Sequence, residues 1–250
     1  MGLFSRFFTK STLLENAADL SILKCDMHSH FIPGIDDGAK TMEESLAMLK
    51  EFHEMGYKKV ITTPHIMSDY YRNTPEIILS GLEKVRAALK ENNIPIEIEA
   101  AAEYYADYEF DQMIDQKSIL SFGEKKYVLF ELSFVSPPDN INGSIFKLLT
   151  NGYRPVLAHP ERYNYWHDDF EKYEEMADKG VLLQVNINSF SGYYSPQTKK
   201  IAEMMVEKGM IAFIGSDCHH AGHVNMMKQV VYEQALHQIL DSGKLLNTSL

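Results

Sequence analysis

The feature of this sequence that most limits its fold is a regular alternation of short apolar runs with longer segments of helical periodicity. The runs have the length and composition of buried strands, and the segments between them carry the apolar spacing of amphipathic helices. The seven runs are residues 22–27, 59–63, 94–102, 127–132, 155–158, 181–187 and 210–214. Repeated strand–helix units favour an α/β fold with a parallel sheet, and this many units favour a closed or nearly closed barrel.

The segments between the runs carry helix signals. Thr41 and Glu44 fit a capping box at the start of the first helix, and Gly56 is well placed to end it. Pro75 suits the first turn of a second helix that continues to about Asn92. Further helices are expected near residues 141–151, 168–179, 196–208 and 225–241. No glycine-rich phosphate loop follows the first run, which argues against the alternative of an open nucleotide-binding sheet.

No repeat, low-complexity tract or linker composition divides the chain. We therefore predict a single domain over residues 1–250, with residues 1–20 as an N-terminal extension whose role the sequence does not assign. The first ten residues are apolar and basic but too short for a signal peptide, and no stretch approaches the roughly 20 apolar residues of a membrane span. The N-terminal extension carries four large apolar side chains, Leu3, Phe4, Phe7 and Phe8. We expect them to pack onto the barrel, with docking on a partner or membrane surface as the alternative.

Charge and cysteine content limit the compartment and the partners. The chain has 24 basic and 35 acidic residues, a net charge of −11, and no long basic run. Binding to nucleic-acid phosphates normally needs a basic face, so we expect no nucleic-acid ligand. The two cysteines, Cys25 and Cys218, do not form a secreted disulfide framework, and we expect a cytoplasmic protein. An acidic chain suits the binding of several cations, although ordinary solubility explains the same charge.

Ionisable side chains stand at the carboxyl end of six of the seven runs. In parallel α/β barrels these ends converge on one mouth, where catalytic groups gather. In chain order the side chains are Asp26, His28, His30, His65, Glu103, Glu131, His159, Glu161, Arg162, Asp217 and His219. Any one of them alone is better explained as a hydrogen-bonded structural residue or a helix cap. Burying so many together without a cation would be costly, so the joint pattern predicts a metal centre.

The spacing within two of these segments supports the same prediction. Residues two apart on an extended segment point to the same side, so His28 and His30 can face one ion, as can Asp217 and His219. Imidazole and carboxylate ligands together suit zinc, manganese or iron, and the absence of a cysteine pair argues against a structural zinc site. A cysteine phosphatase loop and a serine hydrolase elbow are both absent from the sequence.

At these residues the sequence resembles the PHP (polymerase and histidinol phosphatase) superfamily. Within it, the sequence is most similar to the CpsB/YwqE-like branch of manganese-dependent protein-tyrosine phosphatases from capsular and exopolysaccharide gene clusters. The matching segments are residues 26–38, 62–65, 102–103, 130–131, 158–163 and 215–219. The resemblance implies a distorted (β/α)7 barrel, similar to a TIM barrel, that holds three divalent metal ions, with manganese first and iron or zinc as alternatives.

The resemblance also implies roles for individual residues. One ion would be held by His28, His30, Glu103 and Asp217, and a second by Asp37, His65 and His219. The third would be held by Glu131 and His159, with Glu103 bridging. Arg162 would grip the phosphate, since its fork suits bidentate contact, and Arg162, Asp217 and His219 are the expected catalytic residues.

The sequence departs from the branch at one position. Members commonly carry a second phosphate-contacting arginine shortly after the Asp-x-His segment, and this chain has none there. His220, His223 or Lys228 would have to substitute, or the substrate would be held differently. For His220 and His223 we otherwise expect polar contacts at a helix start.

The implied activity is metal-dependent hydrolysis of phosphate monoesters. The first expectation for the substrate is a phosphotyrosine protein, such as the tyrosine-rich tail of a polysaccharide-synthesis kinase. Two alternatives stay open: a small-molecule phosphatase that resembles histidinol phosphatase, and a metal-stabilised regulatory protein of polysaccharide export with little turnover. The sequence leaves the oligomeric state open.

Overall fold

The structure is a computed structural model that describes residues 13–250. The predictions for Leu3, Phe4, Phe7 and Phe8 lie outside the described residues. The strands all pair in parallel, and they are β1 (Cys25–Asp26), β2 (Lys59–Thr62), β3 (His65–Ile66), β4 (Glu97–Ala100), β5 (Glu103–Tyr105), β6 (Tyr127–Glu131), β7 (Arg154–Ala158), β8 (Leu182–Asn186) and β9 (Ile211–Gly215). Each predicted apolar run overlaps at least one of them, which confirms the α/β fold.

Two strands lie beyond the predicted runs. After a short interruption, β3 follows the second run and β5 follows the third. The strands form one sheet of order β1-β2-β4 and another of order β3-β5-β6-β7-β8-β9. Pro64, which has no N–H to donate, lies in the first interruption. Backbone bonds continue across both interruptions, from the Ala101 N–H to the Thr62 carbonyl and from the Glu103 N–H to the Pro64 carbonyl. The two sheets therefore follow one curved surface.

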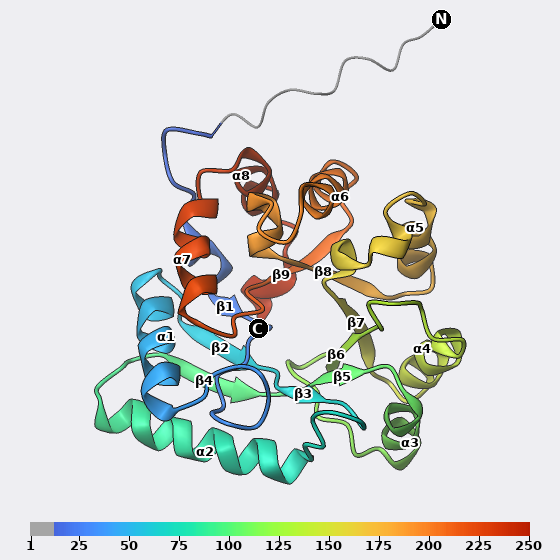
Figure 1. Cartoon of the computed structure of the whole chain (residues 1–250), viewed down its shortest axis with the longest axis horizontal. Helices are drawn as coiled ribbons and strands as arrows, with labels where there is room; N and C mark the ends of the chain where they lie inside the picture. Colours follow the sequence, from blue (N-terminus) through green and yellow to red (C-terminus); the bar gives the residue numbers. More distant parts are fainter. Residues whose placement is uncertain (1–12) are drawn as a thin grey trace, which may run out of the picture.

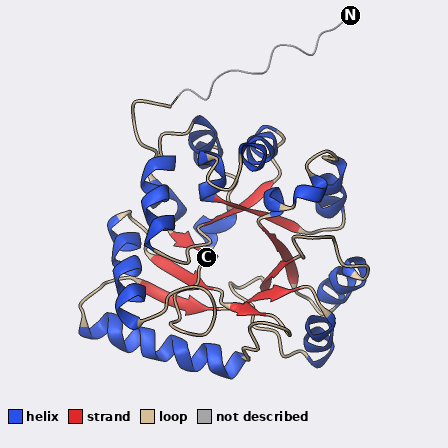
Figure 2. Ribbon diagram, in the orientation of Figure 1, coloured by secondary structure: helices blue, strands red, loops and turns tan. Residues whose placement is uncertain are grey.

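The first and last strands also meet. The Asp217 N–H donates to the His28 carbonyl at 2.8 Å and the His30 N–H to the Cys218 carbonyl at 3.0 Å, just beyond the ends of β1 and β9. The buried Asn247 side chain donates to the carbonyls of Cys25 in β1 and Ile214 in β9. Figure 2 shows the strands around the middle of the molecule with the helices outside them. This arrangement confirms the predicted distorted, TIM-like barrel.

Helices follow the strands around the outside of this ring (Figure 1). They are α1 (Met42–Glu54), α2 (Pro75–Glu91), α3 (Tyr108–Gln116), α4 (Ile141–Thr150), α5 (Glu171–Asp178), α6 (Pro196–Glu207), α7 (Ala221–Val230) and α8 (Gln234–Asp241). The predicted starts of α1 and α2 are correct, because the Thr41 and Thr74 side chains accept from the backbone N–H groups of Glu44 and Ile77. Glu44 does not complete the capping box, since its carboxylate accepts from the Lys40 N–H instead.

The structure corrects the predictions at three places. The first two residues of the first run, Ile22 and Leu23, belong to a 3-10 helix, Leu20–Leu23, because the Asp19 side chain caps it by accepting from the Ser21 N–H. The single helix expected over residues 225–241 is two, α7 and α8, because Glu233 adopts an extended conformation between them. Helix α3 was not predicted, although Asp107 caps it and it buries Phe110.

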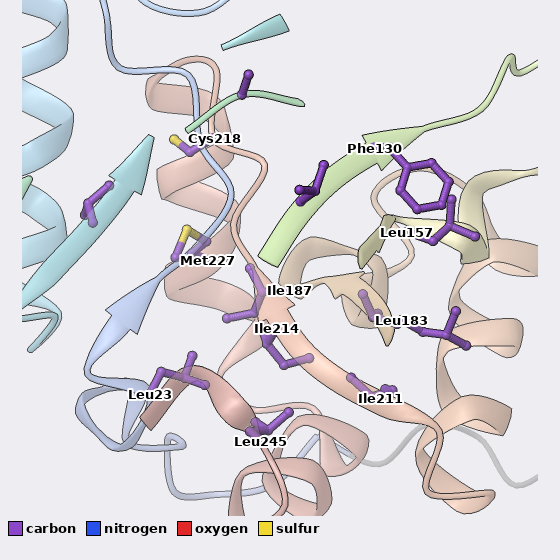
Figure 3. Close-up of a cluster of buried hydrophobic side chains, with 14 of the residues drawn as sticks. Leu23, Phe130, Leu157, Leu183, Ile187, Ile211, Ile214, Cys218, Met227 and Leu245 are labelled. Atoms are coloured by element: carbon purple, nitrogen blue, oxygen red, sulfur yellow. The ribbon is translucent and has the colours of Figure 1, made fainter. Parts of the chain in front are cut away.

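The alternation of side chains along the strands produces two apolar clusters and positions the site. On β6, Val128 and Phe130 belong to the larger cluster between the strands and the helices, while Tyr127 and Leu129 belong to a smaller cluster inside the ring. Figure 3 shows members of the larger cluster, among them Phe130, packed between strand and helix ribbons. Glu131 continues the inward-facing set at the carboxyl end of β6. The interior of the ring is thus apolar along the strands and ionisable at their carboxyl ends, which form its mouth.

No helix within residues 13–250 has both the length and the apolar character to cross a bilayer. The predicted single domain stays a prediction.

Candidate metal centre

The structure brings all nine predicted metal ligands to one mouth of the ring. His28 and His30 follow β1, Asp37 lies in the loop before α1, and the others lie at or just beyond strand ends, namely His65, Glu103, Glu131, His159, Asp217 and His219. Contacts of 3.5 Å or less connect them into one cluster. They include His28 Nε2 to Glu103 Oε2 at 3.1 Å, His65 Nδ1 to Glu131 Oε1 at 3.2 Å and His219 Nε2 to Asp37 Oδ1 at 3.4 Å.

The side-chain atoms gather into three groups that could each hold an ion. The first group is His28, His30, Glu103 and Asp217, with donor atoms all within 4.8 Å of one another. It matches the set that the resemblance implies for the first ion. The second group contains the expected Asp37, His65 and His219 and adds His30.

The third group differs from the expected set in one member. Glu131 and Glu103 are joined by His65, where the resemblance implies His159. His159 Nε2 lies 3.0 Å from Glu103 Oε1 but 3.9 Å from Glu131 Oε2. His159 therefore belongs to the cluster through Glu103, and its ligand role stays a prediction.

A close backbone approach and two left-handed residues shape the ligand segments. A Cβ at Gly38 would lie 2.3 Å from the His30 carbonyl oxygen, so only glycine lets the loop with Asp37 pass this near. Asp217 and His159 have φ values of 49° and 35°, a left-handed region that non-glycine residues seldom adopt. Such conformations cluster at functional sites, where the surrounding structure over-determines them.

Hydrogen bonds outside the cluster orient its imidazoles. The His28 Nδ1 atom lies 2.8 Å from Gln184 Oε1, and His30 Nδ1 lies 2.8 Å from Asp36 Oδ2. Each acceptor places the proton on Nδ1, so that Nε2 faces the cluster with its lone pair, as a ligating histidine requires. Gln184 in turn donates to Asn186 Oδ1 at 2.9 Å, and Asn186 donates to Asp217 Oδ2 at 2.6 Å.

These orienting residues were missed by the sequence reasoning. Asp36 adjoins the predicted Asp37, and its carboxylate accepts from the His65 and Gly38 N–H groups as well as contacting His30. Gln184 and Asn186 are polar residues two apart in an otherwise apolar run, and that spacing is a signal for a shared inward face.

The carboxylates set the electrostatics of the cluster. Burial opposes the charged form of His28, but Glu103 and Asp217 outweigh it and raise its pKa to about 9. At His65, burial is likewise outweighed by Glu103 and Glu131, and the pKa rises to about 10. Burial would raise the pKa values of Glu103 and Asp217, yet neighbouring imidazoles hold both well below their usual range, and Arg162 adds to this effect at Asp217. The carboxylates therefore stay charged and attract positive charge.

The donor set fits divalent cations. His65 Nδ1 lies 3.2 Å from carboxylate oxygens of both Glu103 and Glu131, yet it has no partner of hydrogen-bonding geometry among residues 13–250. The buried His159 Nδ1 atom also lacks a partner within the described part of the chain. A buried imidazole nitrogen that lies beside two carboxylates without hydrogen bonding to either, as His65 Nδ1 does, is what a ligand of a shared ion shows.

A cavity of about 390 Å³ opens over the cluster. Arg162 lines it, and its Nη1 atom donates to Asp217 Oδ2 at 2.8 Å. The guanidinium carbon lies 4.3 Å from the centre of the Tyr194 ring and 4.9 Å from that of Phe134. Arg162 is thus held at the edge of the carboxylate cluster, in the lining of the cavity.

The three candidates for the missing arginine are placed differently. His220 and His223 line the cavity, while Lys228 pairs with Glu51 on α1. His220 also makes the expected helix-start contact, because its Nδ1 accepts from the Gly222 N–H. His223 Nδ1 lies 3.2 Å from the His219 backbone nitrogen, so its polar contacts support the ligand segment.

Comparison with known proteins places the chain in a family. Residues 24–236 match the family described as capsular polysaccharide synthesis, CpsB/CapC. The chain belongs to the CpsB/CapC family. Two curated relatives are each 28% identical to it: the tyrosine-protein phosphatase YwqE of Bacillus subtilis, over 82% of this chain and 80% of the relative, and the tyrosine-protein phosphatase CpsB of Streptococcus pneumoniae, over 78% and 82%.

Solved structures agree with this membership. A structure described as YwqE from Bacillus subtilis and CpsB from Streptococcus pneumoniae, unique metal-dependent tyrosine phosphatases, superposes with a TM-score of 0.79 at 27% identity. It covers 90% of this CpsB/CapC chain and 89% of the other. A histidinol phosphate phosphatase from Lactococcus lactis has a TM-score of 0.53 at 14% identity over 82% and 92% of the two chains, and this likeness concerns the fold alone.

Proposed function

We propose that this member of the CpsB/CapC family is a metal-dependent phosphatase that removes phosphate from phosphotyrosine in proteins, as part of capsular or exopolysaccharide synthesis. One observation carries the proposal: buried imidazoles and carboxylates from distant strands form a single cluster, and an arginine is bonded to its edge. The curated relatives are tyrosine-protein phosphatases, and their solved structure is described as metal-dependent.

The proposed ligands are the nine clustered residues, and the proposed content is three divalent ions, with manganese first and iron or zinc as alternatives. Glu103 supports the sharing of ligands between ions, because it belongs to two of the three groups. Both ligand chemistry and burial fit these metals, since imidazole and carboxylate donors together suit them. Divalent ions in this cluster would supply Lewis-acid polarisation of the phosphoryl group and acidify a water molecule.

The residues of the chain supply binding and charge. Arg162 would neutralise charge on the phosphoryl oxygens, and its fork can contact two of them at once. Asp217 fixes the guanidinium through the bond at 2.8 Å, and the Tyr194 and Phe134 rings flank it, so little reorganisation is needed when phosphate arrives. Asp217 and His219, the other proposed catalytic residues, line the same cavity as Arg162. A phenolate leaving group is a weak base and needs little help from a proton donor.

The proposed partner is a phosphotyrosine protein, such as the tyrosine-rich tail of a polysaccharide-synthesis kinase, in the cytoplasm. The acidic chain supports a substrate other than nucleic acid.

Elemental analysis combined with a phosphatase assay tests the proposal. Purified protein is expected to contain transition metal, to release phosphate from a phosphotyrosine peptide, to lose that activity on chelation and to regain it with manganese. The variant Arg162→Lys keeps the charge without the fork, and we expect kcat/KM to fall on the order of 10²-fold while the metal content stays unchanged.

Histidinol phosphate provides the comparison substrate. A higher kcat/KM on histidinol phosphate than on the phosphotyrosine peptide would replace the proposal with a small-molecule phosphatase. Metal-replete protein that releases no phosphate from any aryl phosphate would favour the regulatory alternative.

A further inference from the structure

An exposed aromatic side chain stands at the mouth of the metal centre. Phe134 follows β6, lines the cavity over the cluster and keeps 45% of its surface exposed. Its ring centre lies 5.6 Å from that of His159 at an interplanar angle of 19°, and 4.9 Å from the guanidinium carbon of Arg162. Phe134 is therefore an apolar ring at the edge of a charged cluster, accessible to a ligand that enters the cavity.

A second aromatic ring lies beside another ligand of the cluster. The Tyr71 ring lies 5.4 Å from the His65 ring at an interplanar angle of 14°, and Tyr71 lines the same cavity. His65 and His159 contact different oxygens of Glu131, Oε1 at 3.2 Å and Oε2 at 3.9 Å. The cavity therefore has an aromatic wall next to each of two histidines that face Glu131 from different sides.

The position of Arg162 decides where a leaving group would lie. Phosphate that contacts both the guanidinium and the cluster must occupy the floor of the cavity, so its ester substituent must extend toward the opening. Phe134 borders this path because it stacks beside Arg162 at the exposed edge. An aromatic substituent on this path would pass beside the Phe134 ring, and aromatic rings attract one another at centroid separations of about 4.5–7 Å.

We propose that Phe134 is a specificity-determining residue whose ring packs against an aromatic leaving group, so that the cavity selects aryl phosphates over alkyl phosphates. The inference rests on the proposed function, since it places a phosphate ester in this cavity, and it goes further by assigning the choice of ester class to one side chain.

Phe134 could instead act only by holding Arg162 through its ring face. That role would affect every phosphate ligand equally, whatever substituent the ligand carries. Ligand pairs with the same anionic group and different substituents therefore separate the two roles.

The test measures binding of two non-hydrolysable ligands, phenylphosphonate and methylphosphonate, to manganese-replete protein by calorimetry. The wild-type protein is expected to prefer phenylphosphonate. In Phe134→Leu, which keeps apolar volume but removes the ring, we expect that preference to fall about 3- to 10-fold, with methylphosphonate affinity unchanged. Phe134→Tyr restores a ring and should restore the preference.

Val135→Ala is the matched control, because Val135 is next in the same loop, is 88% exposed and is not among the described residues that line the cavity. It should leave both affinities unchanged. An unchanged preference in Phe134→Leu, or an equal loss for both ligands, would overturn the inference. A wild-type protein that binds neither phosphonate would overturn it too.

Hydrolysis is measured separately on a phosphotyrosine peptide. Protein that shows the Phe134-dependent preference but releases no phosphate would contradict the proposed function and still support the binding inference. Protein that hydrolyses the peptide but shows no Phe134-dependent preference would support the proposed function and contradict the binding inference.

Discussion

Glu103 contacts imidazoles from more than one of the ligand groups. Its two carboxylate oxygens lie within 3.4 Å of four imidazoles, those of His28, His30, His65 and His159. The side chain is fully buried, and a carboxylate in that position is stable only if positive charge surrounds it. At the residue scale, Glu103 is therefore the side chain on which the proposed sharing of ligands depends most.

Replacing Glu103 with Gln keeps the shape of the side chain and removes its charge. We expect loss of bound metal and a fall in kcat/KM on the order of 10²-fold or more, because two ligand groups lose their shared carboxylate. Elemental analysis and the phosphotyrosine assay check this outcome. Glu99→Gln is the control, since Glu99 pairs with Lys59 on the neighbouring strand and lies outside the ligand groups. Full metal content in Glu103→Gln would contradict the scheme.

Gln184 orients His28 without belonging to any ligand group of the described residues. Gln184→Leu removes the acceptor for the Nδ1 proton, so we expect manganese affinity to weaken by about 10- to 100-fold. Calorimetric titration of metal-free protein measures the effect. Gln229→Leu, at an exposed position in α7, should leave the affinity unchanged. An unaltered manganese Kd for Gln184→Leu would show that His28 needs no orienting partner.

At the scale of elements, one side chain joins the first and last strands. Asn247 donates to the Cys25 carbonyl at 3.0 Å and to the Ile214 carbonyl at 2.7 Å, and it accepts from the Ile214 N–H at 3.0 Å. It lies in the 3-10 helix Leu246–Ser249, whose Leu246 packs against the apolar cluster inside the ring. Asn247 thus joins β1 to β9 and completes the ring at the end opposite the metal centre.

Asn247→Ala should lower the free energy of unfolding by about 2–4 kcal/mol, because buried backbone groups of β1 and β9 lose their partners. Denaturant titration measures the change. The neighbouring Ser249→Ala removes an exposed hydroxyl whose bond is local, and it should alter stability by less than about 0.5 kcal/mol. Equal stabilities for the two variants would mean that the ring needs no closure through Asn247.

At the scale of the whole molecule, the barrel concentrates negative charge at one mouth. Four of the proposed ligands are carboxylates, Asp37, Glu103, Glu131 and Asp217, in a chain whose net charge is already −11. Folding brings these carboxylates together, and the imidazoles of the cluster, with Arg162 at Asp217, oppose their mutual repulsion. Cations that bind the folded state should therefore stabilise the entire fold.

Chelation should lower the thermal midpoint of unfolding. An ion present at about 100 times its Kd stabilises a protein by about 2.7 kcal/mol, which corresponds to about 5–10 °C for a chain of this length. Scanning calorimetry of metal-replete and chelated protein measures the shift. In Glu103→Gln the difference should shrink, because less metal binds. Identical midpoints for replete and chelated wild-type protein would argue against ions at the mouth.

Much of the fold could be predicted because its signals are local. The apolar runs marked the strands, and Thr41 and Pro75 marked the starts of the first two helices. Predictions failed where a local signal was weak or opposed, as at the 3-10 helix that Asp19 caps and at the break before α8. The site residues were predictable because the carboxyl ends of parallel strands meet at one mouth, so position along the chain implied proximity in space.

The sequence by itself determined the alternation of strands and helices, the inward face of each strand and the set of ionisable residues at the mouth. Only the tertiary structure decided which of them contact one another. It placed His65 with Glu131 where His159 was expected, and it recruited Gln184 and Asn186 to orient His28 and Asp217. The physical reason is that periodicity sets the direction of a side chain along its own strand. Distances between strands depend on register, loop paths and packing, which arise only when the ring closes.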